Sequence, residues 1–346
     1  MWNKKTGQGT YIMSVFKSAS ALLAGAVMSL GAVASPSVAT AADLLPVKAK
    51  PIVGAYVPLD VHGYFDLTFA TTRVTPGGLL IYPNNRGYLT QADVGLSLDL
   101  YKDKTGFINS ISVYGGVWNE FWSSPRAVGN RSWQEMDWYA GFIVGFAQYW
   151  KFQAGRLDFV FPSGGQLENY NFSLSYDDAH WGLLFPLNPS VKVLWTHHGG
   201  SAVGNGITKD GYRFEVGISP FFDMKKYWGV AGLTIVMPTW VAVAPEEYFN
   251  RNDGTTNLCG TLNNQPCSMS SLGTFSTGLQ AKYSLAGVVP GRLGNWYLKA
   301  GVQYFHIFID ALRAAQVGTG RDAPAATFND AHKDIFVGTT GVGFSF

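Results

Sequence analysis

Apolar and polar residues alternate with a period of two along most of this chain, and this pattern sets its fold class. In the segment 91–100, "QADVGLSLDL", the even positions carry Ala, Val and Leu, and the odd positions carry Gln, Asp, Gly and Ser. The segments 135–146, 274–285 and 296–304 repeat the pattern. Residues that alternate in this way point to opposite faces of a β-strand, so we expect an all-β chain.

Twelve segments of this kind can be counted. They are 61–74, 87–101, 107–122, 134–148, 150–161, 168–177, 190–198, 210–219, 226–240, 272–286, 295–309 and 333–346. An even number of strands lets an antiparallel up-and-down barrel bring both chain ends to one side. Several connections are short, whereas those after the ninth and eleventh segments are long and polar. This asymmetry predicts short periplasmic turns and long extracellular loops, as in a transmembrane β-barrel.

The composition also favours a strand-built membrane protein. Charged residues make up 14% of the chain, against roughly 25% in soluble domains. A membrane sheet must close on itself, because an unpaired backbone group in hydrocarbon costs several kcal/mol. Aromatic residues near strand ends, among them Trp118, Trp122, Trp133, Trp150 and Trp296, fit interfacial girdles. An exported soluble β-sandwich would also alternate and is the alternative fold.

The first 41 residues have the features of a cleaved secretory signal peptide. Lysines precede an apolar run at 21–34, and Ala39 and Ala41 form an A-x-A site. We expect cleavage near Ala41 or Ala42, a periplasmic N-terminal lead over 42–60 and the barrel over 61–346. Loss of the three lysines in 1–41 changes the formal net charge from +2 to −1, so no nucleic-acid partner is expected.

The chain ends on an aromatic residue inside an expected strand, "GVGFSF". This ending resembles the terminal-strand signature of Gram-negative outer-membrane β-barrel proteins, with Phe346, Phe344 and Val342 at the matching positions. The resemblance implies an outer-membrane location, contact with outer-membrane lipid, recognition of this strand by the barrel-assembly machinery, and closure of the barrel by pairing of the first and last strands. It leaves a homo-oligomer open.

The expected registers turn one set of charged residues toward the barrel interior. These residues are Asp66, Asp93, Asp99, Glu120, Glu135, Asp137, Lys192, Arg213, Glu215, Lys282 and Lys299. Unpaired buried charges are costly, so this set favours a water-filled lumen, and glycines on the same face would leave space. The alternative is a closed interior in which the charges pair. Twelve strands lie between the filled eight-stranded barrels and the open porins of 16–18 strands.

The leading functional hypothesis is therefore a porin-like channel for passive diffusion of small hydrophilic solutes. A non-conducting binding or adhesion barrel that acts through its extracellular loops is the first alternative. An outer-membrane hydrolase using His198 and Ser201 is the second. No catalytic sequence motif is found. We expect neither enzymatic activity nor a cofactor or metal.

Two further expectations concern single segments. Cys259 and Cys267 are close together in a polar stretch of an exported chain, which favours a disulfide over a metal pair. In the segment 150–161 the alternation changes phase and would leave Arg156 and Asp158 on the lipid face. A bulge at Gly155 would repair this conflict.

Overall fold

The computed structural model describes residues 60–75, 80–81, 87–123, 132–161, 166–197, 210–245, 248, 271–314 and 331–346. The expected signal peptide and all but the last residue of the expected lead precede these ranges. The division of the chain at residues 41 and 60 therefore stays a prediction.

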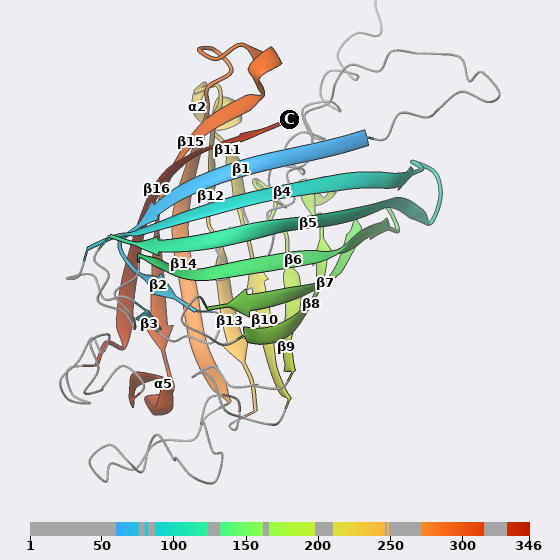
Figure 1. Ribbon diagram of the computed structural model, residues 1–346. Coiled ribbons are helices and arrows are strands. Elements are labelled where there is room, and N and C mark those ends of the chain that lie inside the picture. Colours follow the sequence, from blue (N-terminus) through green and yellow to red (C-terminus); the bar gives the residue numbers. More distant parts are fainter. Residues whose placement is uncertain are drawn as a thin grey trace, which may run out of the picture.

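Twelve antiparallel strands form one closed wall (Figure 1). Ten of them are single elements: β1 (Asp60–Ala70), β4 (Leu89–Lys102), β5 (Ile108–Trp122), β6 (Trp133–Phe146), β7 (Trp150–Val160), β8 (Gln166–Tyr176), β9 (Ser190–His197), β14 (Leu272–Ser284), β15 (Asn295–Ile307) and β16 (Asp334–Ser345). The other two are interrupted, each next to a proline: β10 (Gly211–Ile218) with β11 (Phe221–Asp223), and β12 (Leu233–Val236) with β13 (Thr239–Val243).

The wall closes where the first and last strands meet. β16 pairs with β1 on one side and with β15 on the other, and β14 pairs with β15. Gly63 and Phe346 exchange two backbone hydrogen bonds, of 3.1 and 3.0 Å. Every other neighbour in the wall is also antiparallel. The expected antiparallel up-and-down barrel is confirmed.

We call the end at which β1 begins and β16 ends the periplasmic end, and the opposite end the outer end. The periplasmic turns are 103–107, 147–149, 177–189, 224–232 and 285–294. In the first of them, the amide of Thr105 and then its hydroxyl donate to Asp103, at 2.9 and 2.8 Å, and hold the pKa of that carboxyl below its usual value. The turn 177–189 is long, and Asp178 organises it by accepting hydrogen bonds from the amides of Leu187 and Asn188.

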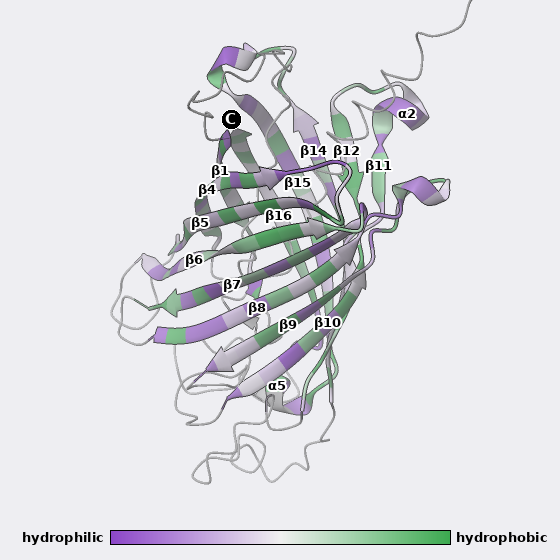
Figure 2. Ribbon diagram, turned by 90° about the vertical axis from the view of Figure 1, so that its right-hand side faces the viewer, coloured by the Kyte–Doolittle hydropathy of each residue, from purple (hydrophilic) through white to green (hydrophobic). Residues whose placement is uncertain are grey.

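The outer face of the wall is apolar along most strands, because alternate residues of each strand point outward. Val94 and Leu96 of β4 are exposed, as are Leu298 and Val302 of β15. Figure 2 shows the same alternation as changes of colour along single strands. An apolar exterior on a closed hydrogen-bonded wall is the arrangement that a bilayer requires.

The prediction of a bulge at Gly155 is wrong. β7 pairs with β6 and β8 without a register shift, so Arg156 and Asp158 do lie on the outer face. They form an outer-face charged cluster: the guanidinium of Arg156 bonds to Asp158 at 2.9 and 2.7 Å, contacts Glu168 of β8 at 3.1 Å and lies 5.1 Å from the centre of the Trp138 ring. Arg156 pairs with both carboxylates, which leaves the cluster with a formal charge of −1.

Short helices occupy some of the connections. α2 (Met224–Trp228) replaces the start of the strand expected at 226–240, and Asp223 caps it by accepting from the amide of Lys225 at 3.0 Å. α5 (Asp310–Ala314) follows β15, and β2 (Arg73–Val74) pairs with β3 (Leu80–Ile81) in the connection after β1. Among the described residues, no helix is long and apolar enough to cross a membrane.

The aromatic girdles are only partly as expected. At the periplasmic end, the ring of Trp150 lies 4.8 Å from that of Tyr176, and the ring of Trp296 stacks on Phe344 at 4.9 Å. Trp118 and Trp122, by contrast, are buried and point inward, because they share a face with Glu120. These two tryptophans therefore pack inside the barrel and are not part of an interfacial girdle.

Candidate functional site in the barrel interior

All of the predicted lumen residues lie on the inner face of the wall. The strand registers place them opposite one another in short sets, as with Asp66 and Asp93, Glu120 and Glu135, Lys192 and Glu215, and Lys282 and Lys299. Asp99, Asp137 and Arg213 occupy the same face of β4, β6 and β10. The alternation thus predicted the inward position of these residues, while their role in conduction stays a prediction.

The middle of the interior holds a network around Asp66. Its carboxylate contacts the ammonium of Lys299 and accepts from the hydroxyls of Tyr297 at 2.8 Å and Thr68 at 2.9 Å. The ammonium of Lys282 lies 3.5 Å from the centre of the Tyr297 ring. The side chain of Lys299 retains 21% of its exposure. This part of the wall therefore presents charge that remains in contact with solvent.

Asp93 is held by two tyrosines. The hydroxyls of Tyr139 and Tyr64 donate to it at 2.6 and 3.1 Å and also contact each other. A Cβ at Gly95 would overlap the Tyr64 ring, and one at Gly116 would overlap the Tyr139 ring. The space beside Gly95 and Gly116 is thus occupied by tyrosine rings of the neighbouring strands. The expectation that they leave free space is wrong at these positions.

A second charged group lies on β9 and β10. The Glu215 carboxylate bonds to the guanidinium of Arg213 and lies 3.0 Å from the ammonium of Lys192. Arg213 is almost fully buried, with its guanidinium 5.4 Å from the centre of the Trp240 ring, whereas Lys192 keeps 20% of its side-chain exposure. With two cations and one carboxylate, the group carries a formal charge of +1, and Lys192 is its most exposed member.

An arginine inserted from the connection after β1 organises the outer half of the interior. Arg73 of β2 donates to both carboxylate oxygens of Glu135, at 2.6 and 3.2 Å, and to Glu120 at 3.3 Å. Its guanidinium lies 4.7 Å from the centre of the Trp118 ring. Asp137 is fully buried beside this group, and its carboxylate accepts no hydrogen bond from any described donor. One cation thus faces three carboxylates.

An apolar cluster also lies in the outer half. Side chains from the connections, Val74, Tyr248, Ile309 and Leu312, are buried against inward residues of the wall, including Leu89, Trp122, Trp240, Ala242, Phe305, Ile307, Ile335 and Val337. We call this group the outer plug. It narrows the interior from the side of the long loops.

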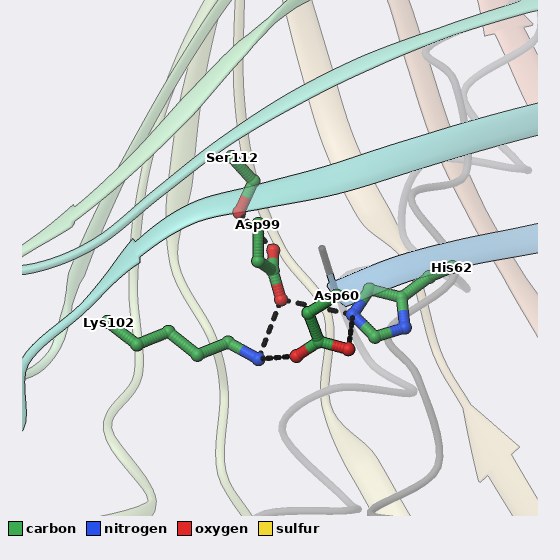
Figure 3. A network of polar contacts seen from close by, with 5 residues as sticks. All are labelled: Asp60, His62, Asp99, Lys102 and Ser112. Carbon is green, nitrogen blue, oxygen red and sulfur yellow. Dashed lines mark hydrogen bonds and ion pairs between the residues drawn. The ribbon is translucent and has the colours of Figure 1, made fainter. Parts of the chain in front are cut away.

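A further polar group lies at the periplasmic mouth (Figure 3). Asp99 accepts from the hydroxyl of Ser112 at 2.6 Å and lies 3.0 Å from the Nε2 atom of His62 and 2.7 Å from the ammonium of Lys102. Asp60 contacts the same His62 and Lys102, at 3.2 and 2.6 Å. Among the described residues, Asp60, His62 and Asp99 are the group whose ligand atoms converge closely enough to hold a metal ion.

Sequence reasoning missed the partners of the predicted charges. Tyr64 and Tyr297 share the inward face of their strands with predicted residues, so the alternation could have found them. His62 is two residues from Asp60 and four from Asp66, which is again the same face. Arg73 falls within the first expected strand, 61–74, but β1 ends at Ala70, and no local signal marks the insertion of Arg73 from the connection that follows.

The other predicted site residues were not assigned to the lumen. Phe346, Phe344 and Val342 lie on the outer face of β16, as expected, while their recognition by the assembly machinery stays a prediction. Cys259, Cys267, His198 and Ser201 lie outside the described residues. On the outer face, their neighbour His197 places Nδ1 2.9 Å from the Asp210 carboxylate.

Comparison with known proteins identifies no close relative. No protein-family model matches the chain, and no curated protein matches it. Among solved structures, a NanC porin shares 13% identity over 83% of this chain and 99% of its own, with a TM-score of 0.37. The translocator domain of the autotransporter NalP from Neisseria meningitidis shares 13% over 84% and 90%, with a TM-score of 0.33. OmpF from Salmonella typhi shares 8% over 83% and 97%, with a TM-score of 0.32.

These likenesses are too distant to assign a function. The fold rests on the strand pairing itself, which closes a twelve-stranded antiparallel barrel with an apolar exterior and a charged interior. That is the architecture of outer-membrane β-barrel proteins.

Proposed function

We propose that the barrel is a channel in the outer membrane of a Gram-negative bacterium, through which small hydrophilic solutes diffuse passively. The observation that carries the proposal is the partly solvated charge on the inner wall, at Lys299 with Asp66 and at Lys192 with Glu215. Charged groups that face inward and still contact solvent are expected along a water-filled passage, since a dry interior would bury them at high cost.

The passage is narrow at its outer half. The outer plug and the Arg73 group occupy the same half of the interior, so they form the constriction that a solute has to pass. In channels, a ring of fixed charges selects by sign and a constriction sets the size limit. The constriction accordingly limits conductance, and the charges nearer the periplasmic end bias the sign of the permeating ion.

The test is single-channel recording of the purified, folded barrel in planar bilayers. Lys299→Gln removes one positive charge from the inner wall. Arg156→Gln removes one positive charge from the outer face and serves as the matched control. Both variants change the net charge by the same amount, so only the position of the charge differs.

We expect discrete conductance steps, and a reversal potential in a salt gradient that shifts toward cation preference for Lys299→Gln. Arg156→Gln should retain the original reversal potential. If the two variants shift the potential equally, the charge of Lys299 does not line the path. Folding of each variant is checked by the mobility difference between heated and unheated protein on a gel.

A non-conducting binding barrel is the second candidate, and the outer plug favours it. Val74, Ile309 and Leu312 are nearly fully buried in the outer plug, and Arg73 is held by two carboxylates. If the plug stays in place, the lumen is shut and the extracellular loops carry the function. Bilayers that remain silent with folded, inserted protein would support this reading over the channel.

A further inference from the structure

The polar group at the periplasmic mouth is built on paired strands. Asp60 and His62 lie on one face at the start of β1, and Asp60 is directly opposite Asp99 in the β1–β4 register. Figure 3 shows the three side chains turned toward one point. The backbone pairing thus brings one imidazole and two carboxylates together without relying on a flexible loop.

The distances within this group match a small coordination shell. The Nε2 atom of His62 lies 3.2 Å from a carboxylate oxygen of Asp60 and 3.0 Å from one of Asp99. Bonds of roughly 2.0–2.1 Å to a tetrahedral metal ion put neighbouring ligand atoms about 3.3 Å apart. Small outward adjustments of Asp60 and Asp99 would therefore admit an ion.

Two of the three ligands are held firmly, and the third gives access. His62 is 7% exposed, and Asp99 is fixed from behind by the hydroxyl of Ser112 on β5, at 2.6 Å. A hydrogen bond to the far oxygen of a ligating carboxylate is the support that metal ligands usually have. Asp60 is 52% exposed at the rim, so an ion can enter from solvent.

A cation already occupies this position in the form of the Lys102 ammonium. It lies 2.6 Å from Asp60 and 2.7 Å from Asp99, and its side chain is 58% exposed. Exposed ion pairs of this kind are weak, and lysine is a long, flexible side chain that can turn into water. Lys102 is thus a competitor that a metal ion can displace.

We propose that Asp60, His62 and Asp99 bind one divalent transition-metal ion of the zinc class, with Lys102 swung away and water completing the shell. An imidazole with two carboxylates suits such ions. Calcium prefers six to eight oxygen ligands, so it fits this group less well. The bound ion joins the start of β1 to the end of β4 at the periplasmic mouth.

The experiment is equilibrium dialysis of the full-length mature barrel, folded in detergent and washed with chelator, against Zn²⁺. Wild-type protein should retain one Zn²⁺ per chain, and Ca²⁺ at the same concentration should not compete. His62→Asn and Asp60→Asn should each weaken binding at least tenfold. His306→Asn is the matched control, because His306 also faces a carboxylate, that of Asp334 at 2.7 Å, but on the outer face.

Lys102→Met supplies the decisive contrast. If the lysine competes with the metal, its removal should tighten Zn²⁺ binding by at least threefold. If the group is only an ion-pair network, Lys102→Met should bind no more tightly than wild type, and the proposal fails. It also fails if His62→Asn and Asp60→Asn bind like wild type, since the ion would then sit at other histidines. Asp60 is half exposed, so its variant is expected to fold even if His62→Asn does not.

Discussion

Replacing Arg73 with glutamine is expected to destabilise the outer half of the barrel interior more than any other single charge change there. The arginine side chain is 4% exposed and supplies three hydrogen bonds to two buried carboxylates, Glu135 and Glu120. Asp137, beside them, gains no hydrogen bond from any described donor. Without Arg73, three carboxylates would share a buried region that contains no other described cation in contact with them.

The magnitude follows from this arrangement. Removing one partner from a buried ion pair typically costs about 3–5 kcal/mol, because the remaining charge is left uncompensated. Arg73→Gln leaves two former partners without their cation, so we expect a loss at the upper end of that range. The double variant Arg73→Met/Glu135→Gln removes one of the carboxylates together with the cation, so it should be more stable than Arg73→Gln, although Glu120 still loses its cation.

The assay is reversible urea unfolding in lipid vesicles, followed by tryptophan fluorescence and gel mobility. Single-channel recording of the same variants tests the link to the constriction, because a released β2 segment should raise the conductance. Lys102→Gln, at the periplasmic mouth, is the control and should lose less than about 1 kcal/mol, because its ammonium pairs with Asp60 and Asp99 in contact with solvent. The reasoning fails if Arg73→Gln loses no more than Lys102→Gln, or if the double variant is less stable than Arg73→Gln.

Three further outcomes are expected. Gly116→Val should lose about 1–3 kcal/mol in urea unfolding, because its side chain would overlap the Tyr139 ring; a stability equal to wild type would show that the ring is not seated there. Asp178→Ala should lose about 1–3 kcal/mol in the same assay, because the amides of a periplasmic turn lose their acceptor, whereas Asp178→Asn should recover part of the loss. Deletion of Phe346 should lower the yield of inserted barrel in cells while purified protein still refolds in detergent; an unchanged yield in cells would argue against recognition of the last strand.

The period of two predicted the wall well because it assigns each residue to a face without reference to its partners. It placed Asp66, Glu215 and Lys299 inward even though their ion pairs were unknown. The closure by pairing of the first and last strands, which the resemblance to outer-membrane barrels implied, is also correct. A local pattern is sufficient wherever the fold repeats one local geometry.

The pattern was insufficient wherever a distant segment changes the environment of a residue. Arg156 and Asp158 stay on the outer face, where Arg156 pairs both with Asp158 and with Glu168 of the next strand, and no period reveals that second partner. Trp118 lies inward by the alternation, but its partner Arg73 arrives from a connection that no period marks. The segment around α2 reads as a strand by its apolar content, but a cap at Asp223 starts a helix instead.

The outer-face charged cluster has a consequence for the surrounding bilayer. Arg156 follows Trp150 by only six positions on the same face of β7, and the Trp150 ring lies at the periplasmic interface. At a rise of roughly 3.3 Å per residue and a tilt of about 45°, they span about 14 Å of depth, against an apolar band of about 25 Å on typical barrels. Lipids beside β7 must therefore shorten or tilt to keep their chains off the charges, so the barrel deforms the membrane along one side.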